Sequence, residues 1–478
     1  MITIIYAAYR QQNIAWDLSV FGKNHINPRE AMKIEKSPFW ILFAILFIAM
    51  DAMTSHAQPL QLSFSDAWEI AQTQNAKMRQ ARLEMDRAEA QVGEAYAGAM
   101  PSVSATGYYQ RNFIIPEMVT ELPPEFGGGT TTFKFQQDNL FSGSVELSQP
   151  IYVAGKVGLA LKIAKLYRQV TEERLAQTKS ELKLQITQLY FGAVVAREWE
   201  RVSQETYDQM RAHLEKVENM YDEGLVSEYD LIRSRVELSN FYPQVISAQT
   251  AREVAFEALS IALDLPKDQD FELTDDLTSY PIGDEVAENH FELALQHRSE
   301  IKQIDQQQRI LDNLLKIEKH GVWWPNIFLV GGYSKTAQEP DFDVDNFYWM
   351  ENLYGGISLT IPIFDGFKAK NRAQQVRVDI RELNLQREQL IRGINLEIIQ
   401  AKSRLREAMK NVKAQQEGVQ LARKGLEIAE VRYENGLATQ LEVLDAQVAL
   451  NQANTNELSA YYDAITAKAD LEKAMGKF

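Results

Sequence analysis

The chain has 478 residues, with 66 acidic and 50 basic side chains, and a formal net charge of −16 at pH 7. This acidic balance disfavours nucleic acid as a partner, because phosphate binding needs an excess of Lys and Arg on one face. The absence of cysteine excludes disulfides, thiolate metal sites and a lipidated N-terminal cysteine in the mature protein. Histidines in metal-binding spacing, Gly-x-Ser-x-Gly and phosphate-binding loops are also missing, so we expect no enzyme, no metal and no cofactor.

The N-terminal segment has the pattern of an export signal. A charged stretch from Met32 to Lys36 precedes an apolar run over 39–50 and a small-x-small site, Ser55 to Ala57. This order predicts a signal peptide at 32–57, with Gln58 as the first mature residue. A transmembrane anchor is the alternative, but the run is short of the roughly 20 residues that a spanning helix needs. Residues 1–31 lack such a pattern, and we interpret them as a mis-assigned upstream extension.

The mature chain is predicted to consist of two structural repeats, 58–284 and 285–478, each with the order helix, strand, loop, strand, long helix, turn, helix. The strands are indicated by polar and apolar residues that alternate with a period of two. In the first repeat the strands are expected at about 102–112 and 139–150, with a loop over 112–138 and a long helix at about 156–221. In the second repeat the strands are expected at about 326–336 and 353–364, and the long helix at about 367–433.

The repeat is visible in the sequence itself. Residues 220–227 return as 432–439, and residues 147–152 return as 359–364 with the same offset. A period this long indicates a duplicated half-domain, because solenoid repeats run at roughly 20 to 50 residues. The Asp- and Pro-rich segment 265–286 joins the halves; we interpret it as a belt around the middle of a helical barrel, with a plain linker as the alternative.

The two long helices carry matching apolar seams. At a rise of 1.5 Å per residue, each helix would span about 100 Å. Their apolar residues follow each other in steps of four and three, as in coiled coils. The members are Leu182, Ile186, Leu189, Ala193 and Ala196 in the first helix, and Ile394, Ile398, Ala401, Leu405 and Ala408 in the second.

Four predicted strands are too few to close a membrane barrel. Unpaired strand edges cannot lie in hydrocarbon, so we expect other subunits to complete the sheet. The polar strand faces, which include Glu146, would then line a lumen, although a solvated wall carboxylate is the alternative for Glu146. Aromatic residues at the strand ends, such as Trp323, Trp324 and Tyr348, would form the interfacial girdles, with core packing as the alternative.

These features resemble the TolC-like outer-membrane efflux family, over about residues 62–478. The most specific match is the pair of Tyr-x-x-Gly-Leu-x-Ser/Thr turns, followed by Asp230 in the first half and by Glu442 and Asp445 in the second. The resemblance implies a mainly α-helical fold with a transmembrane β section. Four strands per protomer would contribute to a trimeric 12-stranded β-barrel that is continuous with a long periplasmic α-helical barrel.

The resemblance also implies a function and partners. The chain would be a homotrimer in outer-membrane lipid that docks a periplasmic adaptor, or membrane fusion protein, and an inner-membrane pump. It would act as the passive exit duct of a tripartite efflux or type I secretion system. The alternative from the residues alone is a periplasmic coiled-coil structural or adaptor protein, which would leave the alternating strands without a purpose.

In the family, the helical turns at the periplasmic end close the entrance and carry acidic rings. Our candidates for gating or selectivity are Asp445, Glu442, Asp230, Tyr433 and Tyr221. The turns themselves are Gly224 and Leu225, and Gly436 and Leu437. Each carboxylate would appear three times around a narrow axis and would favour cations.

Several candidates have a structural alternative. Ser227 with Asp230 and Thr439 with Glu442 have capping-box spacing, and the two tyrosines could share a role in packing the turns. Asp445 lies past the cap and is therefore the first candidate for selectivity. Some family members have an arginine two residues after the turn glycine, where this chain has Val226 and Ala438. We therefore predict a gate that is held more by packing than by ion pairs.

Overall fold

The computed structural model describes residues 60–477, except 124, 126, 135, 268, 282, 284–288, 321–323 and 343–346. The predicted signal peptide and upstream extension, together with Trp323, lie outside the described residues. So does the predicted boundary between the repeats at 284 and 285.

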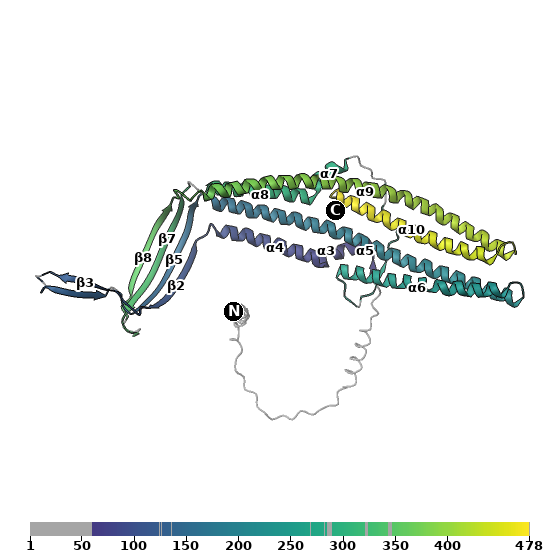
Figure 1. Ribbon diagram of the computed structural model, residues 1–478, viewed down its shortest axis with the longest axis horizontal. Coiled ribbons are helices and arrows are strands. Elements are labelled where there is room, and N and C mark those ends of the chain that lie inside the picture. The colour runs from purple at the N-terminus through teal and green to yellow at the C-terminus, as the bar shows by residue number, and fades with distance from the viewer. Residues whose placement is uncertain are drawn as a thin grey trace, which may run out of the picture. The chain divides into compact units, whose positions relative to one another are not determined.

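Among the described residues the helices occur as two sets of four, one in each half of the chain. The first set is α3 (Phe64–Gln74), α4 (Ala76–Ala97), α5 (Lys156–Asp222) and α6 (Glu228–Leu263). The second set is α7 (His290–His297), α8 (Ser299–His320), α9 (Lys368–Glu434) and α10 (Gln440–Ala474). Helix α5 packs against α6, α9 packs against α10, and α5 and α10 lie side by side, so that two helical hairpins meet along their length (Figure 1).

The predicted apolar seams of the two long helices are confirmed. All ten seam residues except the partly buried Leu189 are less than 9% exposed. The seam of α5 packs in a cluster with α3, α6 and Ile465 of α10, and the seam of α9 packs in a second cluster with α7 and the end of α10. Within the described part of the chain, no helix is apolar and long enough to cross a membrane.

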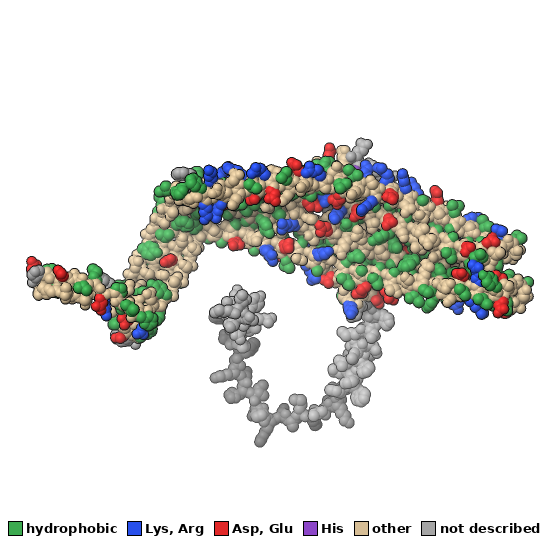
Figure 2. Space-filling model, viewed as in Figure 1, with side chains coloured by type: hydrophobic (Ala, Val, Ile, Leu, Met, Phe, Trp, Pro, Cys, Tyr) green, Lys and Arg blue, Asp and Glu red, His purple; other side chains and the backbone are tan. Residues whose placement is uncertain are grey.

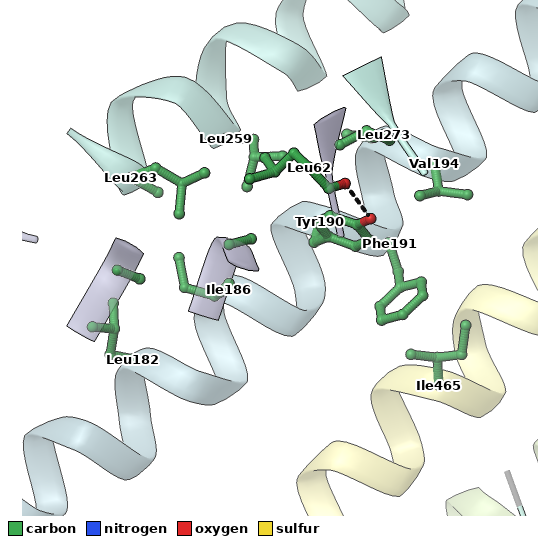
Figure 3. Close-up of a cluster of buried hydrophobic side chains, with 14 of the residues drawn as sticks. Leu62, Leu182, Ile186, Tyr190, Phe191, Val194, Leu259, Leu263, Leu273 and Ile465 are labelled. Atoms are coloured by element: carbon green, nitrogen blue, oxygen red, sulfur yellow. Dashed lines mark hydrogen bonds between the residues drawn. The ribbon is translucent and has the colours of Figure 1, made fainter. Parts of the chain in front are cut away.

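The segment between the two halves is packed against α5 and is not a plain linker. Strand β6 (Phe271–Leu273) pairs in parallel with β1 (Leu60–Leu62). The Tyr190 hydroxyl of α5 donates to the carbonyl oxygen of Leu62 at 2.9 Å (Figure 3). The same hydroxyl also lies 3.0 Å from Asp275 Oδ2, so its proton is shared between the two acceptors. We term this packed region around Leu62, Tyr190 and Leu273 the equatorial core. It connects the middle of α5 to residues that lie far before and far after this helix in the sequence.

The main sheet has four antiparallel strands in the order β2–β5–β7–β8. The strands are β2 (Ser102–Arg111), β5 (Asn139–Val153), β7 (Asn326–Glu339) and β8 (Met350–Thr360). The two central strands come from different halves and pair with each other, which joins the halves in one sheet. Within the described part of the chain, the edge strands β2 and β8 each have a partner strand on one side only.

The strand register gives the sheet one polar and one apolar face. Ser104 of β2 lies opposite Glu146 of β5, and Glu146 lies opposite Gly332 of β7. On the other face Val145 lies opposite Tyr333, which in turn lies opposite Leu353 of β8. Charged side chains are interspersed over the helices in Figure 2, whereas the visible face of the sheet carries few of them.

Two sequence-based expectations about this region are wrong. Residues 112–138 are not simply a loop, because they contain a second antiparallel pair, β3 (Glu117–Leu122) and β4 (Gly129–Lys134). Their β-branched residues form short strands on either side of the glycines 127–129, which all have positive φ. Strand β8 ends at Thr360 and not at 364, because Thr360 pairs with Asn326, the first residue of β7 after Pro325.

The geometry of the equatorial core predicts a small effect for Tyr190→Phe. Both acceptors of the lost hydroxyl keep a partner, since the Leu62 carbonyl also accepts from the Thr274 amide and Asp275 accepts from the Phe64 amide. We expect a loss of about 1 kcal/mol in the free energy of unfolding, measured by chemical unfolding of the detergent-solubilised protein. Tyr167→Phe, at an exposed position on α5, is the control and should be neutral. A loss of about 3 kcal/mol or more, as for a core cavity, would contradict this role of the hydroxyl.

Candidate functional site

The α5–α6 and α9–α10 turns have the same backbone geometry. Gly224 and Gly436 adopt φ values of 72° and 70°, a region that suits glycine because it has no Cβ. The next residue in each turn donates its amide back into the preceding helix, Leu225 to the Met220 carbonyl at 2.8 Å and Leu437 to the Arg432 carbonyl at 2.7 Å. This is a Schellman ending, and it explains why the Gly-Leu pair occurs twice. Leu225 and Leu437 are exposed.

Two of the candidate carboxylates form the predicted capping boxes. The side chain of Asp230 accepts a hydrogen bond from the Ser227 hydroxyl at 2.7 Å, and the Ser227 oxygen accepts one from the Asp230 amide. Glu442 accepts a hydrogen bond from the Thr439 amide at 3.1 Å. Glu442 also forms an exposed ion pair with Arg432 at 3.4 Å. Both carboxylates therefore have a structural role at the first turn of their helix.

The two candidate tyrosines are not equivalent, which corrects the expectation of a shared packing role. Tyr433 is 9% exposed and belongs to an apolar cluster with residues of α5, α6 and α10, whereas Tyr221 is 38% exposed and lies outside it. Burial, and then the charge of Asp230, raise the pKa of Tyr433. The duplication thus places the two tyrosines on matching turns but buries only the second.

Asp445 lies on α10, three residues beyond Glu442, and its side chain is exposed. Within the described part of the chain it makes no ion pair or side-chain hydrogen bond. The residue that corresponds to it in the first half, at the offset between the two turns, is Arg233. Asp445 is therefore a free acidic side chain near one turn only.

Ion pairs at the turns are present but exposed. Lys216 of α5 meets Glu434 of α9 at 3.0 Å, and Arg235 meets Glu218 at 2.8 Å, each with side chains more than 40% accessible. Pairs of this kind contribute about 0–1 kcal/mol. Val226 and Ala438, each two residues after a turn glycine, pack against the apolar cluster of Tyr433.

A cavity of about 170 Å³ lies between α5 and α9 close to the turns. Its lining includes His213, Lys216, Glu430, Tyr433 and Glu434. The rings of His213 and Tyr433 are 5.4 Å apart. His213 Nε2 and the Tyr433 hydroxyl are buried without a hydrogen-bond partner among the described residues. Burial, and then the charge of Lys216, lower the pKa of His213 to about 4.

Polar side chains also occupy the interface between the α5–α6 and α9–α10 hairpins near the turns. They form what we term the polar seam, and each is less than 9% exposed. Its members are Ser203, Thr206 and His213 of α5, Ser234 of α6, and Gln440, Gln447 and Asn451 of α10. Thr206 contacts Asn451 at 3.4 Å, and the Gln440 amide donates to the Ser234 hydroxyl.

The polar seam is only partly satisfied. The Ser203 hydroxyl and the Oε1 atoms of Gln440 and Gln447 have no hydrogen-bond partner within the described chain. Each buried group of this kind costs about 1–3 kcal/mol. The apolar clusters beside it are small, with Met210, Phe241, Val245 and Leu444 as the buried members of one. The helices are therefore held less firmly here than at the equatorial core.

The polar seam was not predicted from the sequence, although a signal for it is present. Gln440, Leu444, Gln447 and Asn451 follow each other in steps of four, three and four, the spacing of a coiled-coil seam. Three of these four positions are polar, where a seam is normally apolar. Polar residues at these seam positions predict a polar interface between the helices.

Glu146 is exposed on the polar face of the sheet. The described residues hold no cluster of three His, Asp or Glu side chains suited to a metal ion.

Comparison with known proteins agrees with this architecture. Residues 68–263 and 291–477 match the family model described as outer membrane efflux protein. Outer membrane protein TolC of Vibrio cholerae is 20% identical over 342 residues, which cover 71% of this chain and 78% of TolC. The cobalt-zinc-cadmium resistance protein CzcC of Cupriavidus metallidurans is 20% identical over 347 residues, with 70% and 77% covered. The solved structure of CusC matches with a TM-score of 0.70 at 19% identity, over 88% of this chain and 95% of CusC.

The chain belongs to the outer membrane efflux protein family, because the family model matches most of its length. It has the TolC-like fold, with a duplicated half-domain, a β section and long helices. Members of the family are outer-membrane channels with a helical barrel in the periplasm.

The buried His213 predicts an acid-sensitive turn region. Its pKa is about 4 in the folded protein, whereas an unperturbed histidine has a pKa of 6.5. Between these two pH values the unfolded chain binds more protons than the folded protein, so the free energy of unfolding falls as the pH falls. Between pH 7.5 and pH 5 we expect a loss of about 2 kcal/mol from this one group. The measurement compares unfolding of the wild type and His213→Gln at both pH values. His320→Gln serves as the control, and an equal pH dependence for all three proteins would contradict the assignment.

Proposed function

We propose that the protein is a homotrimeric exit duct of the outer membrane, part of a tripartite efflux or type I secretion system. The observation that carries this proposal is the pair of unpaired edges on the β2–β5–β7–β8 sheet. Every side chain of β2 and β8 is exposed in the single chain, and their outward apolar residues include Val103, Leu353 and Ile357. Hydrocarbon does not tolerate unpaired backbone groups, so β2 of one copy pairs with β8 of the next.

Three copies of a four-stranded sheet give a barrel that is wider than the small barrels filled by side chains. The polar face with Ser104, Ser144 and Glu146 then lines the lumen, and the apolar face contacts lipid. The helices α5 and α9, each of 67 residues, continue the wall for about 100 Å. The duct is passive, and the energy for transport comes from an inner-membrane pump that is joined to it by a periplasmic adaptor.

The α5–α6 and α9–α10 turns form the gate at the periplasmic end of the duct. Three features support this assignment. The polar seam is an interface between two helical hairpins in which several polar groups lack a hydrogen-bond partner. The cavity lined by His213 lies beside it. Asp445 is an unpaired carboxylate close to one turn. Opening separates the hairpins along the polar seam, and water then satisfies the groups that lack a partner in the closed state.

The selectivity role of Asp445 is tested by conductance in planar bilayers. The wild type should form cation-selective channels that multivalent cations block, because three Asp445 carboxylates surround the entrance. Asp445→Ala should reduce both the preference for cations and the block. Glu253→Ala, which removes an exposed carboxylate of α6 away from the turn, should change neither property. An unchanged preference and block in Asp445→Ala would rule out this role, and a wild type that conducts no ions would contradict the duct itself.

The role of the polar seam is tested by Gln447→Leu. The substitution removes an unsatisfied buried amide that is 2% exposed and leaves a side chain of similar volume. The closed state should gain about 1–2 kcal/mol, so the open probability should fall about tenfold, since 1.4 kcal/mol corresponds to a factor of ten.

Thr187→Val is the matched control for this substitution. Thr187 is fully buried in the equatorial region and bonds the Lys183 carbonyl at 2.8 Å. It should alter thermal stability without changing the open probability. An unchanged or increased open probability in Gln447→Leu would contradict the gate at the polar seam.

A further inference from the structure

The apolar row of β8 continues beyond the end of the strand. On the outward face of the sheet this row includes Leu353, Ile357 and Leu359. The same alternation carries on to Ile361 and Ile363, which are 52% and 80% exposed. In the proposed duct this face contacts lipid. The last members of the row therefore lie at the periplasmic end of the membrane section, where the long helices begin.

Two exposed phenylalanines follow this row at the junction with α9. Phe364 and Phe367 are 72% and 61% exposed, and their ring centres are 5.4 Å apart in an edge-to-face contact. Exposed aromatic residues at the end of an apolar strand face are typical of the boundary between the hydrocarbon and the headgroups. The position of the two rings therefore agrees with a membrane surface at the start of α9.

Basic residues follow the phenylalanines directly. Lys368, Lys370 and Arg372 lie in the first two turns of α9, are exposed, and form no ion pair within the described residues. The ammonium group of Lys370 lies 5.9 Å from the centre of the Phe367 ring. Residues 366–378 contain no acidic side chain, although the whole chain has a net charge of −16. Figure 2 shows hydrophobic side chains where the sheet meets the helices and Lys and Arg over the adjoining part of α9.

The basic residues are not explained by the stability of α9. The N-terminus of a helix carries a partial positive charge and favours acidic side chains, yet the first turn of α9 holds none. Asp365, which precedes the helix, accepts a hydrogen bond from the Ala369 amide at 2.8 Å. A negatively charged partner outside the chain would offset the positive charge that collects here.

The first repeat has a shorter version of the same order. Ile151 corresponds to Ile363 at the offset of the two turns, and it is 61% exposed. Lys156, the first residue of α5, corresponds to Lys368. The first turn of α5 also lacks an acidic residue. Both long helices therefore begin with a lysine next to an exposed apolar residue, and the second repeat adds further basic residues.

We propose that the start of α9 is a binding site for an anionic phospholipid of the periplasmic leaflet. The acyl chains lie against Ile361 and Ile363, and the headgroup phosphate is bound by Lys368, Lys370 and Arg372. The order of apolar, aromatic and basic residues along the chain then matches the order of hydrocarbon, interface and phosphate in a leaflet. The occupant is a lipid and not a protein, because the apolar row is continuous with the lipid-facing side of the sheet. The inference rests on the proposed duct and adds the class of lipid and its leaflet.

Native mass spectrometry of the detergent-solubilised protein measures this selectivity. The probes are phosphatidylglycerol, whose headgroup is anionic, and phosphatidylcholine with the same acyl chains, whose headgroup is zwitterionic. Each Lys or Arg near an anionic lipid surface improves the affinity about fivefold. Phosphatidylglycerol should therefore bind about tenfold or more tightly than phosphatidylcholine. Equal affinities for the two lipids would overturn the proposal.

A triple substitution tests the basic residues. Lys368→Gln, Lys370→Gln and Arg372→Gln, made together, should lower the affinity for phosphatidylglycerol about tenfold or more. The affinity for phosphatidylcholine should stay unchanged, because the apolar row is intact. An undiminished preference for phosphatidylglycerol in this variant would place the lipid site elsewhere and overturn the assignment.

The matched control removes the same charges further along the same helix. Arg406→Gln, Lys410→Gln and Lys413→Gln replace exposed residues that form no ion pair within the described part of the chain. This variant should keep the selectivity of the wild type. An equal loss in both triple variants would show that the net charge of the protein, and not a site at the start of α9, attracts the lipid.

Inorganic phosphate distinguishes a lipid site from a site for a free anion. At equal ionic strength, phosphate should displace no more phosphatidylglycerol than chloride does. Stronger displacement by phosphate would identify an anion site that does not need the apolar row, and would overturn the assignment to a lipid.

The mass of the particle separates a failure of this site from a failure of the duct. A three-chain particle without a preference for phosphatidylglycerol would overturn the lipid site and keep the proposed function. A one-chain particle would overturn the proposed trimer, whatever its lipid preference.

Discussion

The architecture depends on the pairing of backbone groups at the two edges of one sheet. Strands β5 and β7 are paired on both sides, whereas β2 and β8 are paired on one side only. Because a bilayer offers no hydrogen bonds to the free side, we propose that the chain completes its sheet with copies of itself. In the proposed trimer this requirement sets the threefold symmetry of the whole assembly. The polar face of the sheet would then surround a lumen, and three pairs of helical turns would meet at one axis.

The helices pack more tightly against each other in the middle of the helical part than near the turns. At the equator, Leu182, Ile186 and Tyr190 are almost completely buried against β1, β6 and α3. Toward the turns the apolar clusters become smaller, and the polar seam replaces them between α5 and α10. Buried groups without hydrogen bonds favour the separated, hydrated arrangement, so the same feature that weakens the closed state lowers the cost of opening. In the proposed duct, tight packing at the equator and weaker packing near the turns would allow the gate to open without loss of the fold.

Much of this fold follows from local patterns in the sequence. The heptad spacing of Ile394, Ile398 and Ala401 specifies a buried seam, and the Gly-Leu turns specify the Schellman endings, because both depend on neighbouring residues. Other features depend on contacts between distant segments. The burial of Tyr433 but not of Tyr221 arises from packing against α5, α6 and α10, which duplication alone does not determine. The β3–β4 hairpin was missed because its short strands are separated by glycines that favour a loop. The polar seam was not predicted, because seam positions of packed helices are normally apolar and its partners come from distant segments of the chain.

Hydrogen exchange at the strand edges tests the central claim most directly. Amides of β2 and β8 that point away from β5 and β7 are free in a single chain, but are hydrogen-bonded when copies close the sheet. In the detergent-solubilised protein we expect peptides covering 102–111 and 350–360 to exchange as slowly as those covering 139–153 and 326–339. The α9–α10 turn provides a fast-exchanging reference in the same sample. Rapid exchange of about half of the amides in both edge strands, with the central strands protected, would contradict closure of the sheet by neighbouring copies.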